Sequence, residues 1–264
     1  MTIVFWTVAV SIIGVLVGSF LNVVIFRTKK QMPLVSRSVC LTCLEPVSKL
    51  DLIPILSFFA LKGRCRKCTA VIEWQYPVLE LVTGLLFGIL FIRAVSGIGY
   101  GSFVGEDEWL LVFFRDVIIA CYLLIIFVYD FKYKVIPDRF SVPPMIVALL
   151  FNFALGAPPL MLLFSGLIIG AFFAAQFIIS KGNWVGGGDI RLGLLMGWYL
   201  GLPLALVALL LAYISGSIIG IVLILLKHRK LDSHVPFGTF MALAIFVTLF
   251  FGDVLLNWYL GLLL

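Results

Sequence analysis

Long apolar segments recur along this chain and constrain its fold more than any other feature. Eight of them are long enough, or nearly so, to cross a hydrocarbon layer of about 30 Å. They lie near 3–26, 76–94, 109–130, 141–156, 159–180, 190–201, 204–226 and 238–262. The hydrophobic residues, 63% of the chain, come in runs and not in the amphipathic stripes of a soluble core. The sequence therefore predicts an all-α polytopic membrane protein with about eight transmembrane helices, of which the fourth and sixth are short.

The basic residues are concentrated in the loops on one side of these segments. All 19 Lys and Arg residues except Arg93 and Arg115 fall in four loops, which share one side if there are eight spans. These loops are 27–75, 131–140, 181–191 and 227–237. By the positive-inside rule they are cytoplasmic, so both termini lie outside, an N-out/C-out arrangement. Bases clustered in this way suit an anionic lipid bilayer as partner, and we expect no nucleic-acid binding.

The one sizeable segment outside the predicted spans, residues 27–75, contains two CxxC pairs. Cys40 and Cys43 form the first pair, and Cys65 and Cys68 form the second after 21 intervening residues. Two such pairs are typical of a tetrahedral zinc site in which four thiolates complete the ligand set, so the metal would be structural. Two disulfides are the alternative, which a reducing cytoplasm disfavours. A loop of this size buries little core, and a metal ion would stabilise it.

Two carboxylates lie at the predicted cytoplasmic edge of the membrane, where ionisable groups are candidates for function. Asp130 ends the third span and Asp189 begins the sixth, so the two share one depth. Two facing carboxylates can share a proton and activate water, as in aspartic proteases. The alternative for Asp189 is a plain helix N-cap. We expect Asp138 to cap the fourth span. Asp116 is next to Arg115 toward the outer end of the third span, and we expect it to form an ion pair or to anchor the helix at the membrane interface.

Three consecutive glycines, Gly186, Gly187 and Gly188, precede Asp189. Glycines allow another backbone to approach closely and permit unusual φ and ψ values. A peptide in a membrane must be unwound before it can be cut, so we predict that these glycines bind an extended substrate. Glu80, about one turn inside the second span, is also near the cytoplasmic edge and is a candidate for substrate binding.

A series of motifs resembles one family of enzymes over nearly the whole chain. The motifs are "GSFLNVVIFR" (18–27), the two CxxC pairs, "LDLIPILSF" (50–58), "LKGRCRKC" (61–68), "YPVLELVTG" (76–84), "YDFKYKVIPD" (129–138), "GGGDIRL" (186–192) and "VPFGTF" (235–240). Their order is that of type IV prepilin peptidases, which resemble the GxGD class of intramembrane aspartyl proteases.

The resemblance implies a multi-pass, bifunctional enzyme of the bacterial cytoplasmic (inner) membrane. Such enzymes cut the leader from type IV prepilins or type II secretion pseudopilins, and then N-methylate the new terminus with S-adenosylmethionine. It implies that Asp130 and Asp189 are catalytic. It also implies three regions: a first transmembrane helix at 1–26, a four-cysteine zinc loop associated with methyl transfer at 27–75, and a membrane aspartyl protease core at 76–264.

Two other functions compete with this one. The first is an intramembrane aspartyl protease without methyltransferase activity, because Leu41 and "EWQYP" depart from the family pattern within the loop associated with methyl transfer. The second is a transporter or membrane scaffold with a zinc-ribbon loop. A transporter should show inverted repeats and helices broken at the bilayer midplane, and the sequence shows neither.

Overall fold

The computed structural model describes residues 2–40, 42–97, 105, 108–226 and 236–263. Within these residues the regular structure is helical, apart from two isolated antiparallel β-bridges in the cysteine-containing loop. The chain divides into two compact units, residues 1–95 and 96–264, which we call the N-terminal and C-terminal units.

The N-terminal unit is built on two long apolar helices, α1 (Thr2–Lys30) and α3 (Gln75–Ser96). Glycines bring the two backbones close together, because a methyl group on Gly14 would lie 2.9 Å from the Cα atom of Gly84. Small residues at helix interfaces allow such close packing in lipid. The contacts of α3 group it with α1 in the N-terminal unit, and the division of the chain into regions 1–26, 27–75 and 76–264 stays a prediction.

The loop between these helices, residues 31–74, contains η1 (Leu50–Leu52) and α2 (Leu56–Ala60). It is tied to the end of α1 by Arg27, whose buried guanidinium donates hydrogen bonds to four backbone carbonyls. These carbonyls belong to Pro33, Leu34, Ser36 and Arg37. A small aromatic cluster supports the loop further along, where the ring centroids of Phe58 and Trp74 are 4.9 Å apart.

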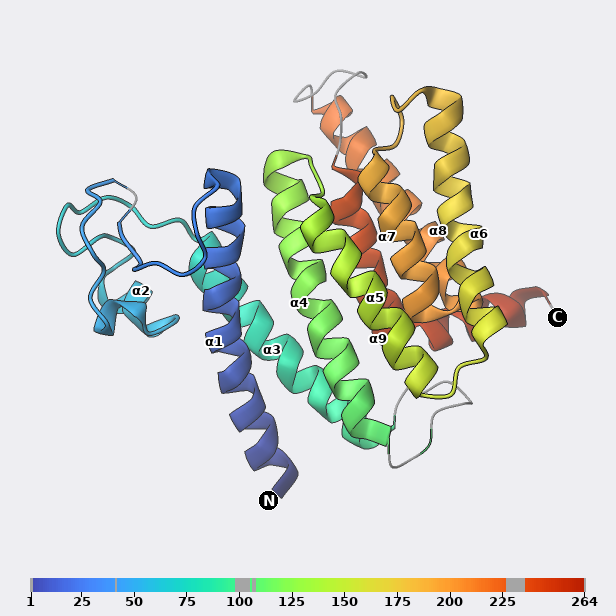
Figure 1. Ribbon diagram of the computed structural model, residues 1–264, viewed down its shortest axis with the longest axis horizontal. Coiled ribbons are helices and arrows are strands. Elements are labelled where there is room, and N and C mark those ends of the chain that lie inside the picture. Colours follow the sequence, from blue (N-terminus) through green and yellow to red (C-terminus); the bar gives the residue numbers. More distant parts are fainter. Residues whose placement is uncertain (1, 41, 98–104, 106–107, 227–235, 264) are drawn as a thin grey trace. The chain divides into compact units, whose positions relative to one another are not determined.

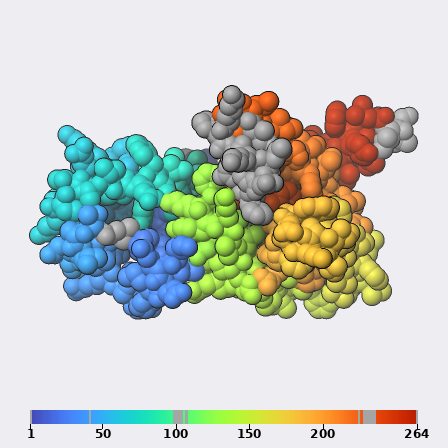
Figure 2. Space-filling model, turned by 90° about the horizontal axis from the view of Figure 1, so that it is seen from above, coloured from blue at the N-terminus to red at the C-terminus, as the bar shows by residue number. Residues whose placement is uncertain are grey.

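The C-terminal unit consists, in its described part, of six helices. They are α4 (Trp109–Tyr133), α5 (Asp138–Ala154), α6 (Pro159–Ser180), α7 (Gly187–Leu200), α8 (Leu202–Leu225) and α9 (Phe237–Leu263). Successive helices run in opposite directions, so α4, α6 and α8 finish at the same end of the unit at which α5, α7 and α9 begin (Figure 1). Figure 2 shows this end face on, with the green connection between α4 and α5 and the golden end of α6 at the surface.

All eight apolar segments predicted from the sequence are helices. Six of them, α1, α3, α4, α6, α8 and α9, are long and apolar enough to cross a membrane. The other two, α5 and α7, have 17 and 14 residues. Fourteen helical residues extend only about 21 Å. In its described residues the protein is therefore all-helical with six candidate membrane spans, and the predicted total of eight spans and the N-out/C-out orientation stay predictions.

Candidate active site and metal centre

Asp130 lies in the last turn of α4, and its side chain is almost completely buried. Its Oδ2 atom accepts hydrogen bonds from the backbone N–H of Thr239, at 2.8 Å, and from the hydroxyl of the same residue, at 3.1 Å. Thr239 is in the first turn of α9, where the backbone N–H groups have no partner within the helix. The carboxylate of Asp130 therefore faces the positive end of the α9 dipole.

Asp189 lies in the first turn of α7 and is also buried. Its Oδ2 atom accepts a hydrogen bond from the backbone N–H of Gly186 at 2.9 Å, and its own N–H donates to the carbonyl of Gly186 at 3.0 Å. This reciprocal pair is the capping arrangement expected of an acidic residue at the third position of a helix. Asp189 thus caps the helix, but the cap occupies only one of its carboxylate oxygens.

The two carboxylates are close enough to interact electrostatically. Among the described residues, none donates a hydrogen bond to the Oδ1 atom of Asp130 or of Asp189. Each aspartate therefore keeps one oxygen for a water molecule or a substrate. The two aspartates thus lie near each other within the C-terminal unit, and their role as a catalytic pair stays a prediction.

The three glycines before Asp189 have different surroundings. None has a positive φ, so unusual backbone angles are not the reason for them. A methyl group on Gly187 would meet no atom within 4 Å, whereas one on Gly188 would lie 2.7 Å from the Cβ atom of Ile136. Gly188 therefore permits close packing, whereas Gly187 borders open space, and the binding of a substrate by the three glycines stays a prediction.

Gly238 is a residue whose role sequence reasoning missed, as it missed that of Thr239. A methyl group on Gly238 would lie 3.1 Å from Oδ2 of Asp130 and would overlap the side chain of Ile136. Both residues belong to the motif "VPFGTF", which carried the family resemblance without suggesting a contact. The motif brings the start of α9 against Asp130.

Asp138 is the first residue of α5 and is exposed. Instead of capping that helix as predicted, its carboxylate pairs with the guanidinium of Arg191 on α7. Asp138 therefore helps to hold α5 and α7 together and lies outside the carboxylate pair.

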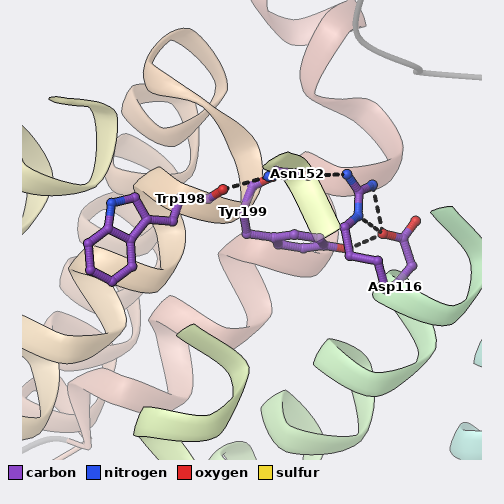
Figure 3. A network of polar contacts seen from close by, with 5 residues as sticks. Asp116, Asn152, Trp198 and Tyr199 are labelled. Carbon is purple, nitrogen blue, oxygen red and sulfur yellow. Dashed lines mark hydrogen bonds and ion pairs between the residues drawn. The ribbon is translucent and has the colours of Figure 1, made fainter. Parts of the chain in front are cut away.

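A second buried polar cluster lies near the other end of α7 (Figure 3). The predicted ion pair forms, because Arg115 Nε lies 2.8 Å from Asp116 Oδ1. The hydroxyl of Tyr199 donates to the same carboxylate oxygen at 2.9 Å, and Arg115 Nη1 donates to Asn152 Oδ1 at 2.6 Å. Asn152 in turn donates to the backbone carbonyl of Trp198 at 2.6 Å.

This cluster joins α4, α5 and α7. The carbonyls in the last turn of a helix have no intrahelical partner, and α7 is too short to carry its last turn across a layer of about 30 Å. In hydrocarbon each unpaired carbonyl would cost several kcal/mol. The side chain of Asn152, on α5, therefore supplies a hydrogen-bond donor to the carbonyls at the end of α7. Through its bond with Arg115 it also links α7 to α4, the helix that carries Asp130.

Glu80 has a defined contact within the N-terminal unit. Its carboxylate is buried and accepts a hydrogen bond from the backbone N–H of Ile55 at 2.7 Å. Ile55 has φ of 61°, a conformation that needs support in a branched residue. The structure thus gives Glu80 a role in holding the loop, and its role in substrate binding stays a prediction.

The four cysteines of the loop form one cluster, in which all four sulfur atoms lie within 4.8 Å of one another. Cys40 Sγ and Cys68 Sγ are 3.7 Å apart. A tetrahedral zinc site with metal–sulfur bonds of about 2.3 Å has sulfur–sulfur edges of about 3.8 Å. No disulfide joins the described cysteines. The donor set and its spacing fit a zinc ion.

The two CxxC turns are built alike. The N–H of Cys40 donates to the carbonyl of Glu45 at 2.9 Å, and the N–H of Cys65 donates to the carbonyl of Ala70 at 2.8 Å. Within the first turn, hydrogen bonds from the backbone amides of Cys43 and Thr42 lower the pKa of the Cys40 thiol to about 6. A thiol that ionises readily is prepared to bind a metal ion.

A cavity of about 480 Å³ lies in the N-terminal unit between the cysteine turns and the two long helices. Its lining includes apolar rings and charged groups, among them Phe26, Arg37, Glu45, Phe58 and Glu73. This volume is within the range of sites that bind small molecules.

Comparison with known proteins agrees with these features. Residues 12–94 match the model of the bacterial peptidase A24 N-terminal domain, and residues 117–221 match the model of the type IV leader peptidase family. A protein of Aeromonas salmonicida named prepilin leader peptidase/N-methyltransferase is 30% identical over 287 residues, which cover 97% of this chain and 94% of the relative. A protein of the same name from Bacillus subtilis is 30% identical and covers 94% of this chain and 95% of its own.

A further relative of that name, from Pseudomonas aeruginosa, is 27% identical over 94% of this chain and 91% of its own length. No solved structure gives a significant match. The two family models cover parts of both units, and the relatives align over nearly the full length, so the chain belongs to the type IV leader peptidase family.

Proposed function

We propose that this protein cleaves the leader peptide of type IV prepilins or type II secretion pseudopilins, with Asp130 and Asp189 as its catalytic pair. The observation that carries the proposal is the meeting of two buried carboxylates from α4 and α7, each with one oxygen that binds no described residue. The names of the relatives support the class of substrate.

In the proposed reaction the pair holds one proton and a water molecule lies between the two Oδ1 atoms. The ionised carboxylate takes a proton from the water, whose oxygen attacks the carbonyl carbon of the scissile bond. The protonated carboxyl donates its proton to the carbonyl oxygen. When the tetrahedral intermediate collapses, the carbon–nitrogen bond breaks and the departing amine takes the proton that the first carboxylate received from the water. A hydroxyl of the intermediate returns its proton to the other carboxylate, so the pair again holds one proton. The apparent pKa values of this reaction belong to the pair and not to either residue.

The substrate would reach the pair beside the first turn of α7. The space next to Gly186 and Gly187 allows an extended backbone to lie close to Asp189. Lys132, Lys134 and Arg139 lie at this end of the unit, which by the positive-inside rule favours a cytoplasmic position for it in a bacterial inner membrane. We therefore propose that cleavage occurs at the cytoplasmic membrane face, with α5 and α7 completing eight spans.

Methyl transfer to the new N-terminus is proposed as the second activity. The relatives' names include it, and the N-terminal unit has a cavity large enough for a nucleoside cofactor. S-adenosylmethionine would supply an activated methyl group there, and a carboxylate of the lining such as that of Glu45 would suit the substrate's amine. Zinc held by Cys40, Cys43, Cys65 and Cys68 would shape this loop, because four thiolates leave no open coordination position.

The proposal is tested by incubating the purified protein with a prepilin and measuring the mass of the products. Loss of the leader is expected first, followed, when S-adenosylmethionine is added, by a gain equal to one methyl group. The variants Asp130→Asn and Asp189→Asn should not cleave, whereas Asp138→Asn, which alters an exposed carboxylate, should cleave at the wild-type rate. Cleavage without any methyl gain would support a protease alone, and no cleavage by the wild-type protein would refute the proposal.

A further inference from the structure

A polar pair on α6 and α8 lies beside Asp189. The hydroxyl of Tyr213 donates a hydrogen bond to Oε1 of Gln176 at 2.9 Å. The same hydroxyl is close enough to the carboxylate of Asp189 to interact with it electrostatically. Both residues interrupt highly apolar helices, where polar side chains are costly and indicate function.

The packing of α6 against α7 places Gln176 at the level of Asp189. A methyl group on Gly193 of α7 would lie 2.5 Å from the ring of Phe173 on α6, so these two residues are in register. The helices run in opposite directions (Figure 1). One turn toward the start of α7 from Gly193 is Asp189, and one turn toward the end of α6 from Phe173 is Gln176.

The amide nitrogen of Gln176 is a buried donor without a partner among the described residues. Its position is fixed, because the carbonyl of the same amide is held by Tyr213. The ring of Tyr213 is stacked on Phe173, with centroids 6.4 Å apart, and lies 5.0 Å from the ring of Phe237. An unpaired N–H group in an apolar interior is expensive, so a held and unpaired donor beside a catalytic group indicates that a ligand supplies its acceptor.

We propose that the amide nitrogen of Gln176 binds a backbone carbonyl oxygen of the substrate next to the scissile bond, with Tyr213 as the residue that positions the amide. The inference rests on the proposed function of Asp130 and Asp189. A helical substrate that is unwound for cleavage loses the partners of its carbonyls, and in lipid those carbonyls need new donors. Gln176 supplies one of them at the depth of Asp189. Recognition of a backbone carbonyl requires no particular side chain in the substrate.

Removal of this polar pair should not lower the stability of the protein. Because no described residue accepts a hydrogen bond from the Gln176 nitrogen, the double variant Gln176→Leu/Tyr213→Phe removes the unpaired donor together with the hydroxyl that holds its amide. Its unfolding temperature should equal or exceed that of the wild type, while kcat/KM for cleavage should fall roughly tenfold to a hundredfold. Tyr213→Phe alone should lower kcat/KM less, since the amide remains but is no longer held.

Thr248→Val is the matched control. Thr248 on α9 also has a buried oxygen without a partner among the described residues, but it lies nine residues beyond Thr239, about 13 Å along the helix. Removal of its hydroxyl should leave both stability and cleavage unchanged. The contrast separates the loss of a substrate contact from the mere removal of a buried polar atom.

The direct test pairs the enzyme variants with modified substrates. Synthetic prepilin segments carry a thioamide, a weaker acceptor than an amide, at one backbone position at a time around the scissile bond. At the position that Gln176 binds, the thioamide should slow the wild-type protein several-fold and have no further effect on Gln176→Leu. If every position slows both proteins equally, or if the double variant unfolds at a lower temperature and cleaves at the wild-type rate, the pair is structural and the inference fails. A wild-type protein that cleaves no substrate at all would instead refute the proposed function and this inference with it.

Discussion

Replacing Asn152 with leucine should destabilise the C-terminal unit, although the two side chains have the same number of heavy atoms in the same branched arrangement. Asn152 is buried and has contacts on two helices. It donates to the carbonyls of Trp198 and Tyr199, at 2.6 and 3.3 Å, and accepts from Arg115 at 2.6 Å. Each partner that loses such a bond while buried costs about 1–3 kcal/mol, and a charged partner costs more. The free energy of unfolding should therefore fall by about 3 kcal/mol or more.

Tyr199→Phe is the graded comparison within the same cluster. It removes one hydrogen bond to Asp116, whose carboxylate keeps its ion pair with Arg115. The expected loss is about 1 kcal/mol, clearly smaller than that for Asn152→Leu. Unfolding of the detergent-solubilised variants, followed by tryptophan fluorescence, measures both changes.

Cleavage shows whether the cluster also positions the active site. Asp189 and the last turn of α7 lie on one rigid helix of about 21 Å. If the end of that helix is released, Asp189 should move relative to Asp130 and kcat should fall at temperatures where the variant remains folded. An Asn152→Leu protein as stable as the wild type would show that the carbonyls of α7 have other donors. A less stable protein with unchanged kcat would show that the cluster does not position Asp189.

The remaining predictions concern the aspartates, the cysteines, the glycines and the substrate. Asp130→Asn and Asp189→Asn should each abolish leader cleavage, and combining them should cost nothing further, because the two act as a unit. Any trace of cleavage that remains should be equally slow in the double variant and in each single variant. Cleavage near the wild-type rate by either single variant would contradict the prediction. Cys65→Ser should release one zinc ion per chain, measured by metal analysis, and expose the 31–74 loop to proteolysis; a wild-type protein that contains no metal would defeat the idea. Gly188→Ala should lower cleavage far more than Gly187→Ala, because only the first methyl group would collide with its surroundings, and equal kcat/KM values would refute this. Moving the leader junction of the substrate two helical turns, about 11 Å, deeper into its apolar segment should stop cleavage there, and mass analysis that finds efficient cutting at the displaced bond would place the active site elsewhere.

The helices could be predicted from the sequence because apolar runs are a local signal. Their grouping could not. In lipid every face of a helix is apolar, so the packing of α3 on α1 depends on which glycines meet, as Gly14 and Gly84 do. The short helices η1 and α2 were also not predicted, since they lie in a loop whose structure depends on the contacts of Arg27 and on the cysteine cluster.

The candidate site was predictable to the extent that it is charged. Asp130 and Asp189 stand out because carboxylates are rare in apolar segments. Thr239 and Gln176 do not stand out, because uncharged polar residues occur in many membrane helices and their partners lie on other helices. Glu80 has the same rare charge as the aspartates, yet its carboxylate binds a loop backbone N–H. A carboxylate in an apolar segment therefore predicts that the group has a specific partner. Only the structure shows whether that partner belongs to the fold, as for Glu80, or whether an oxygen is left for a substrate.

The positions of the two aspartates follow from one residue, Ile136, in the connection between α4 and α5. Its side chain fills the space that a methyl group would need at Gly188 and at Gly238, so it contacts the start of α7 and the start of α9. Two helix N-termini are thereby brought to one place, and each supplies a backbone N–H to a carboxylate: α9 to Asp130, and the residue before α7 to Asp189. Positive helix ends lower the cost of placing two carboxyl groups, of which one is ionised in the proposed pair, in an apolar environment. Gly188 and Gly238 are thus needed chiefly because a side chain at either position would push apart the starts of α7 and α9, which hold the two carboxylates.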